Sequence, residues 1–240
     1  MNSWFAETID QPFQPFSSSH ISMLILYFVG IVALFYYHKK IIQYTKLYDM
    51  IRWMLFLLLF SSELLYQVWA ITNGVWGLRG HIPLHLCGIA SLIAMVTLVT
   101  RHEKLIAITF FFGLIPAFMA LITPDLPHNF QHFRFWKFFI HHIAISWTSI
   151  FLIATSSTRL KLKSIVSSYV LLILYALVIG LLVNPLLDSN YLYLANKPMS
   201  TTPLDFLGSG FTYYINLGLL VLFVFLVQFF IYVKFKNKDK

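Results

Sequence analysis

Seven apolar stretches, each close to the length that crosses a lipid bilayer, constrain this chain more than any other feature. A hydrocarbon core of roughly 30 Å needs about 20 apolar residues in a helix, whose backbone polar groups bond within the segment. The stretches lie at about residues 20–38, 51–72, 83–100, 104–123, 135–156, 165–187 and 210–233. We therefore expect an all-α, polytopic membrane protein with about seven transmembrane helices in one bundle.

Composition agrees with this class and argues against a soluble domain. Hydrophobic residues make up 59% of the chain and charged residues 11%, whereas soluble domains carry about 25% charged residues. We expect an extracytoplasmic segment at 1–19, one transmembrane domain at 20–233 and a basic cytoplasmic tail at 234–240. The first nineteen residues lack the basic start and apolar core of a cleavable signal peptide. The single cysteine cannot form an internal disulfide.

Basic residues predict the orientation of the bundle. If the N-terminus is outside, only Arg79, Arg134, Lys137 and Lys197 among the 17 basic residues lie on the outer side. The positive-inside rule therefore predicts an outer N-terminus and a cytoplasmic C-terminus. The net charge of +8 then lies mainly in inner loops that face anionic headgroups, and no nucleic-acid partner is expected.

Most of the other polar groups fall on the predicted outer side. They are His81, His85, Cys87, Asp125, His128, His132, His141, His142, Asn184, Asp188 and Asp205. Ionisable groups within a membrane are costly and usually face the bundle interior, so this distribution indicates a site that opens toward the outer leaflet. Each histidine taken singly is equally compatible with an interfacial position in headgroup water.

The stretch "HIPLHLCGIA", residues 81–90, carries the candidate nucleophile. Pro83 suits the first turn of a helix, which places Cys87 about four residues in, where the helix N-terminus favours a thiolate. On such a helix His85 and Cys87 point to opposite faces, so the base must come from another helix. His81 and His85 are spaced for a metal, but no further ligand stands beside them, and we expect neither metal nor cofactor.

The alternative for Cys87 is packing. Cys87, Ser91 and Ala94 recur at helical spacing, and such stripes of small residues let membrane helices approach closely.

The candidate base lies in "KFFIHHIAISWTSI", residues 137–150. His142, Ser146 and Ser149 form one polar stripe on an apolar span, which indicates a face turned inward. His142 lies about seven residues into its span, at a depth of roughly 10 Å that Cys87 could match from the same side. A thiolate beside a histidine is the minimal apparatus for acyl transfer. His141 points about 100° away.

Further groups could assist this pair. Glu63 shares a helix face with Gln67 and Tyr66, and a carboxylate within a span is either functional or a bond between helices. Asp125 follows Pro124 at the end of the fourth span, where it either orients a histidine or caps a turn. Asn184 precedes Pro185 near the end of the sixth span. It too either assists the site or only shapes the turn. Asp205 lies in an aromatic outer loop, 188–209, which we expect to lie at the interface or fold over the mouth of the bundle.

Five motifs occur in order between about residues 80 and 215: "PLHLC", "TPDL", "HFRFWKFFIHH", "NYLYLANKP" and "LDFLG". Together they resemble the YwaF-type family of bacterial integral membrane proteins. That family is distantly similar to a eukaryotic transmembrane acyltransferase that forms ether phospholipids and to the androgen-induced membrane hydrolases of fatty-acid esters. The resemblance implies a multi-pass protein of a bacterial plasma membrane.

The resemblance also implies roles for particular residues. The catalytic cysteine and histidine of the acyltransferase match Cys87 and His142, whereas the hydrolases use threonine with histidine. Bacterial members often carry serine where this chain has His141, so two adjacent imidazoles are candidate bases.

Two functions follow. One is an intramembrane lipid acyltransferase or lipid ester hydrolase that uses a Cys/His pair near the outer leaflet on a membrane lipid or acyl-chain substrate. The other is a non-enzymatic protein that binds or transports a lipid or small molecule, although no inverted repeat is visible to support transport.

Overall fold

The computed structural model describes residues 3–6, 12–198 and 202–238, and helices dominate them. The expected segment 1–19, loop 188–209 and tail 234–240 therefore each include residues outside the described ones. The α-helices are α1 (Ser18–Gln43), α2 (Thr45–Thr72), α3 (Leu86–Thr100), α4 (Glu103–Ile122), α5 (Phe133–Thr155), α6 (Leu162–Val178), α7 (Asn184–Leu187) and α8 (Gly210–Lys238). Short helical turns are η1 (Ser3–Phe5), the π-helical η2 (Ile179–Val183), η3 (Tyr191–Tyr193) and η4 (Pro203–Leu207).

The all-α membrane fold is confirmed, with one difference in helix length. Six helical segments of the described chain are long and apolar enough to cross a membrane, and α3, with 15 residues, is a shorter apolar helix. At 1.5 Å per residue α3 covers about 22 Å, less than the hydrocarbon core. The segment 73–85 before Leu86 is not helical, and membranes tolerate non-helical backbone only where it lines a cavity or is buried in protein.

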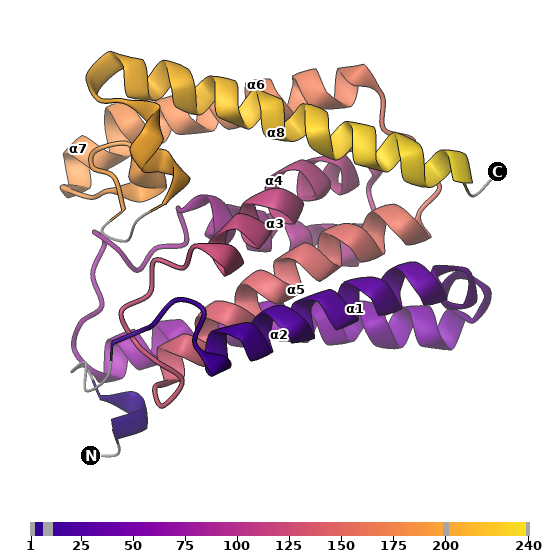
Figure 1. Ribbon diagram of the computed structural model, residues 1–240, viewed down its shortest axis with the longest axis horizontal. Coiled ribbons are helices and arrows are strands. Elements are labelled where there is room, and N and C mark those ends of the chain that lie inside the picture. Colours follow the sequence, from indigo (N-terminus) through magenta and orange to yellow (C-terminus); the bar gives the residue numbers. More distant parts are fainter. Residues whose placement is uncertain (1–2, 7–11, 199–201, 239–240) are drawn as a thin grey trace.

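Helix α5 is the centre of the bundle. It contacts α1, α2, α3 and α4, and 78% of its apolar window is buried, against 28% or less for α1, α2, α8 and the segment Leu162–Leu187. Helices α6 and α8 pack against each other and against α4, and form a separate layer opposite α1 and α2 (Figure 1). The polar stripe predicted on α5 is buried accordingly, since His142, Ser146 and Ser149 are all inaccessible or nearly so.

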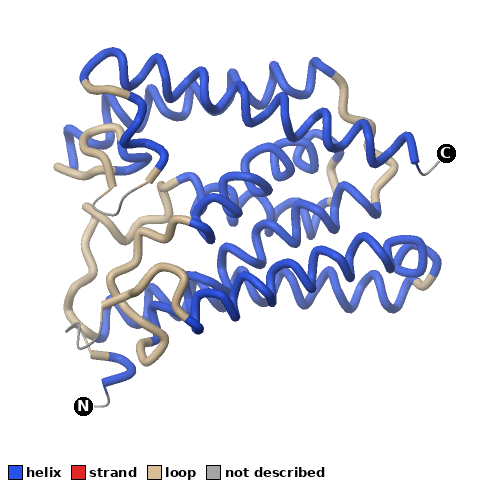
Figure 2. Tube along the Cα trace, in the orientation of Figure 1, coloured by secondary structure: helices blue, strands red, loops and turns tan. Residues whose placement is uncertain are grey.

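Loops gather at one end of the bundle, where the segments 73–85, 123–132, 188–198 and 202–209 meet (Figure 2). We call this the cavity end. The N-terminal helix η1 lies at this end, and the C-terminal end of α8 lies at the opposite end (Figure 1).

The sixth span runs to Leu187, the end of the predicted range 165–187, and Asn184 before Pro185 does not stop the helix. Pro185 lacks an N–H and its ring would clash with the carbonyl four residues earlier in a regular helix. The five residues of η2 widen into a π-helical turn immediately before it, and the helix then runs on to Leu187. A π-bulge absorbs the proline without ending the span.

Candidate functional site

A cavity of about 940 Å³ lies between α3, α4 and α5 on one side and α6 and α8 on the other, at the cavity end. Its polar wall contains Glu63, Tyr66, His81, His85, Cys87, Asp125, Arg134, Lys137, His141 and His142. Its apolar wall includes Leu172, Ile173, Ala176, Leu177, Leu217, Val221 and Phe225. Pockets of this size suit small-molecule ligands, and the separation of polar from apolar lining suits an amphiphile.

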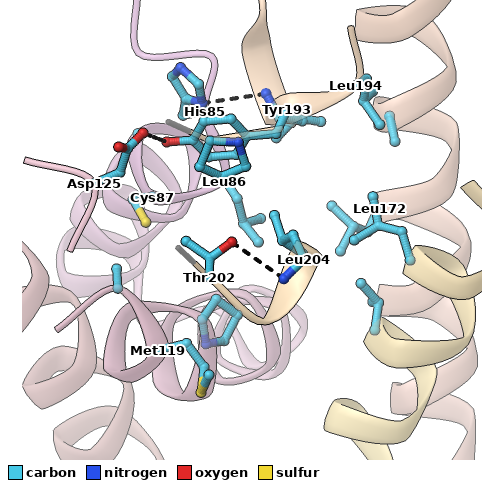
Figure 3. A pocket seen from close by; sticks show the side chains of 18 of the residues that line it. His85, Leu86, Cys87, Met119, Asp125, Leu172, Tyr193, Leu194, Thr202 and Leu204 are labelled. Carbon is cyan, nitrogen blue, oxygen red and sulfur yellow. Dashed lines mark hydrogen bonds between the residues drawn. The ribbon is translucent and has the colours of Figure 1, made fainter. Parts of the chain in front are cut away.

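Cys87 opens onto this cavity from the first turn of α3. The helix begins at Leu86 with His85 as its N-cap, so the expectation that Pro83 starts the helix is wrong. The segment 81–85 folds back against the helix start instead, because Gly88 leaves room for the Pro83 carbonyl. Cys87 is therefore the second helical residue and is partly buried. The side chains at Cys87 and Asp125 face Leu172 and Leu194 across the cavity (Figure 3).

The packing alternative predicts that the small residues Cys87, Ser91 and Ala94 lie against other helices. Ser91 and Ala94 are buried within the bundle, as expected for close helix contact. Cys87 packs against the hydrophobic core and also lines the cavity, so its packing and catalytic roles both stay predictions.

Replacing Gly88 with alanine should lower the thermal unfolding midpoint of the purified protein. A Cβ at this position would lie 2.5 Å from the Pro83 carbonyl oxygen, and overpacking of this kind costs about 1–3 kcal/mol. Gly80→Ala is the matched control in the same wall, because a Cβ there meets nothing within 4 Å. Equal midpoints for the two variants would contradict the observed packing of the 81–85 segment.

Both candidate bases reach the cavity from α5. The Nδ1–H of His142 donates to the Phe138 carbonyl at 2.7 Å, which leaves Nε2 as the acceptor of a neutral ring. His141 Nδ1 lies 3.1 Å from Ser62 Oγ on α2. The two rings are 5.9 Å apart.

The structure brings Cys87, His141 and His142 to one cavity but does not join the thiol to an imidazole. Both histidines line the same cavity as Cys87. Within the described part of the chain, no hydrogen bond connects Sγ to either ring. The assignment of the Cys87/His142 pair therefore stays a prediction.

Two cations in this cavity were not identified as site residues from the sequence. Arg134 and Lys137 lie on the first turns of α5 and line the polar wall. Sequence reasoning placed both as outer-side charges. Lys137 follows Arg134 by three residues and His141 follows it by seven, so all three lie along one helix face. This spacing is the sequence signal that could have identified the two cations as site residues.

Glu63 is one of the charged groups that face Lys137. Its Oε2 lies 3.8 Å from Lys137 Nζ, and its Oε1 accepts a hydrogen bond of 2.7 Å from Gln67. The Lys137 ammonium also lies 4.3 Å from the centre of the Tyr66 ring. Glu63 thus connects α2 with α5 and also lines the cavity. Both predicted roles of this carboxylate, a functional group of the site and a bond between helices, therefore have support.

Asp125 and His85 belong to a second polar group at the mouth of the cavity. The Tyr193 hydroxyl donates to Asp125 Oδ2 at 3.0 Å, and the Leu192 N–H donates to His85 Nδ1 at 3.4 Å (Figure 3). His85 accepts this hydrogen bond at Nδ1, which therefore carries no proton. Burial and Asp125 together raise the pKa of Tyr193, which keeps the phenol protonated as a donor.

Asn184 and Asp205 organise the outer loop and do not line the cavity. The Asn184 side chain donates to the Tyr191 carbonyl and accepts from the Tyr191 N–H and from Ser189. Asp205 Oδ2 accepts from the Thr202 N–H at 2.9 Å, which closes the capping box of η4. These contacts hold the part of the loop that supplies cavity wall, including Leu192, Leu194, Thr202 and Leu204. The described part of the loop thus folds over the mouth of the bundle.

Fold and cavity together define a multi-pass α-helical membrane protein with an amphiphilic internal cavity at one end of the bundle. The chain belongs to the TMEM164 family, whose profile matches residues 15–229. Comparison with curated proteins and with solved structures gave no match. The family match supports a transmembrane protein, and the narrower YwaF-type assignment and bacterial origin stay predictions.

Proposed function

We propose that this protein is an intramembrane lipid acyltransferase or lipid ester hydrolase in which Cys87 is the nucleophile and His142 the general base. The observation that carries the proposal is that both side chains line one cavity whose remaining wall is largely apolar. The resemblance to the ether-phospholipid acyltransferase, whose catalytic cysteine and histidine match these positions, supports the same assignment.

The chemistry follows from these two groups. His142 Nε2 takes the thiol proton as Cys87 Sγ attacks the ester carbonyl of an acyl lipid. The tetrahedral intermediate collapses to a thioester, and the imidazolium returns its proton to the departing alcohol. A second alcohol then attacks the thioester to complete transfer, or water attacks it to complete hydrolysis. Each route regenerates the free thiol.

The apolar wall supports an acyl-chain substrate. Leu172 and Leu177 on α6 and Val221 on α8 line the cavity opposite the polar wall. Burial of methylene groups there would contribute about 0.8 kcal/mol for each CH₂. An acyl chain along this wall would have its ester near the polar groups.

We propose further that the cavity end faces outward and that the membrane is the plasma membrane, because the positive-inside rule predicts an outer N-terminus. An epitope tag at the N-terminus should be removed by protease added to intact cells. A tag at the C-terminus should resist until the cells are permeabilised. The reverse pattern would place the cavity on the cytoplasmic leaflet.

The direct test is to trap the acyl-enzyme. The purified protein in lipid nanodiscs is incubated with a nitrophenyl ester of a medium-chain fatty acid and digested for mass spectrometry. We expect an acyl adduct on Cys87 that neutral hydroxylamine removes, as a thioester requires. A thiol that reacts with maleimide but never with the ester would exclude the proposed nucleophile.

One observation favours a second function. Because no hydrogen bond joins the Cys87 thiol to an imidazole among the described residues, the cavity could bind a lipid without covalent chemistry. A protein that retains bound lipid through purification, yet forms no adduct at Cys87, would be such a binder.

A further inference from the structure

A second cleft, of about 440 Å³, is formed where the chain turns from α1 to α2, from α3 to α4 and out of α5. These three turns lie at the end of the bundle opposite the cavity end (Figure 1). The residues that line the cleft include five with a hydroxyl on a short side chain, Thr45, Thr155, Ser156, Ser157 and Thr158. The acyl transfer proposed at Cys87 uses none of them.

Two long helices begin at this cleft. Thr45 is the first residue of α2 and Glu103 is the first residue of α4, and both line the cleft. Within the described chain, the N-cap residues Tyr44 and His102 make no side-chain hydrogen bond to the helix that follows them. The first N–H groups of a helix have no partner within the helix and carry the positive end of its dipole. Donors at the starts of α2 and α4 can therefore reach one anion.

Arg101 supplies a cation to the same cleft. Its backbone is held as the C-cap of α3, where its N–H donates to the Thr97 carbonyl at 2.8 Å. Its side chain makes no hydrogen bond or ion pair with any residue that the structure describes. A guanidinium can donate two parallel hydrogen bonds to the oxygens of a phosphate. Arg101 therefore keeps its full donor capacity for such a ligand.

Two hydroxyls of the cleft also lack a partner. Thr158 lines the cleft with only 5% of its surface exposed, and its Oγ1 has no hydrogen-bond partner among the described residues. The Oγ of Ser156, which lines the same cleft, likewise has no partner there. A buried hydroxyl without a partner is costly and uncommon in folded proteins. Donation to the oxygens of a bound anion would remove this cost.

We propose that this cleft binds a phosphate group, held by the Arg101 guanidinium, the first N–H groups of α2 and α4, and the hydroxyls of Ser156 and Thr158. All of these groups donate hydrogen bonds, and the oxygens of a phosphate accept them. The exposed carboxylate of Glu103 also lines the cleft and opposes an anion. A lipid headgroup and inorganic phosphate present the same chemistry to this site, which is independent of the reaction at Cys87.

Binding of inorganic phosphate is measured by isothermal titration calorimetry. The full-length protein is kept in maltoside detergent, which carries no phosphate, at constant ionic strength. Arg101→Gln should weaken the affinity about ten-fold, because it removes the paired donors. Arg159→Gln is the matched control, since Arg159 is an exposed cation one residue after Thr158 that does not line the cleft. Its affinity should change less than about two-fold, and equal losses in the two variants would overturn the proposal.

Two further variants separate ligand binding from a structural role. Thr158→Val removes the unpartnered hydroxyl and keeps the branched shape. It should preserve or raise the thermal unfolding midpoint without phosphate and weaken phosphate binding about five-fold. Glu103→Gln should strengthen binding about three-fold, because the opposing charge is removed. A lower midpoint with unaltered affinity in Thr158→Val, or weaker binding in Glu103→Gln, would leave these residues a structural role and refute the phosphate site.

A second titration identifies the source of the phosphate. The probe is dihexanoyl phosphatidic acid, a water-soluble lipid whose headgroup is a phosphate monoester. An affinity at least about ten-fold above that of inorganic phosphate, weakened in Arg101→Gln, would identify a lipid headgroup. Equal affinities for the two probes, weakened in the same variant, would identify a soluble phosphate. Binding of neither probe, or binding that Arg101→Gln leaves intact, would exclude the site.

Discussion

Replacing Cys87 with alanine should abolish acyl turnover, with a loss of at least about 10³-fold in the rate of ester cleavage. The thiol is the group that would form the covalent intermediate, and no second cysteine exists in the chain to replace it. The measurement is release of nitrophenol from the ester probe by purified protein in nanodiscs. Cys87→Ser should also be strongly impaired, because a hydroxyl is a weaker nucleophile than a thiolate.

Ser91→Ala is the matched control for Cys87→Ala. Ser91 lies one helical turn further along α3 and is buried, and its hydroxyl has no hydrogen-bond partner in the described part of the chain. Removing an unsatisfied hydroxyl is neutral or slightly stabilising, so turnover should stay within about two-fold. Full activity of Cys87→Ala would remove the cysteine from the mechanism.

The second large effect is expected at His142. His142→Gln should reduce the rate of acyl-enzyme formation about 100-fold or more, the usual contribution of a general base. The Nδ1 hydrogen bond to Phe138 directs Nε2 as the acceptor, and glutamine removes that basic nitrogen while it keeps a polar side chain. Formation of the Cys87 adduct, followed by stopped-flow absorbance of nitrophenol, is the readout.

His141→Gln decides between the two adjacent imidazoles. If His142 is the base, His141→Gln should lose no more than about ten-fold. Ser62→Ala, which removes the partner of His141 Nδ1, should then behave like His141→Gln. A larger loss in His141→Gln than in His142→Gln would transfer the role of base to His141.

The helices were predictable because a membrane span is a local property. An apolar stretch of about 20 residues must form a helix in lipid to satisfy its own backbone, so the spans were placed from hydropathy alone. The start of α3 was not predictable in this way, because the expected start at Pro83 is wrong. Proline suits a helix start in isolation, but here the tight contact of Gly88 with the Pro83 carbonyl and the fold of the 81–85 segment delay the helix to Leu86.

The candidate site was predictable in part. The inward polar stripe on α5 could be identified from periodicity, because His142 and Ser146 lie on one face whatever packs against it. The roles of Asn184 and Asp205 could not be identified in this way. Asn184 stood out as a polar residue near a span end and Asp205 as a carboxylate in the outer loop. Only the fold of the loop shows that they bond to Tyr191 and Thr202 and do not line the cavity.

The sequence by itself determined the membrane class, the positions of the spans and the concentration of titratable groups at one end of the bundle. Only the tertiary structure decided which of those groups share a cavity. Hydropathy and periodicity fix how each helix is built and which of its faces is polar. Whether Lys137 meets Glu63, or Cys87 faces the same space as His142, depends on the rotation and depth of separate helices, and these follow from side-chain packing across the whole bundle.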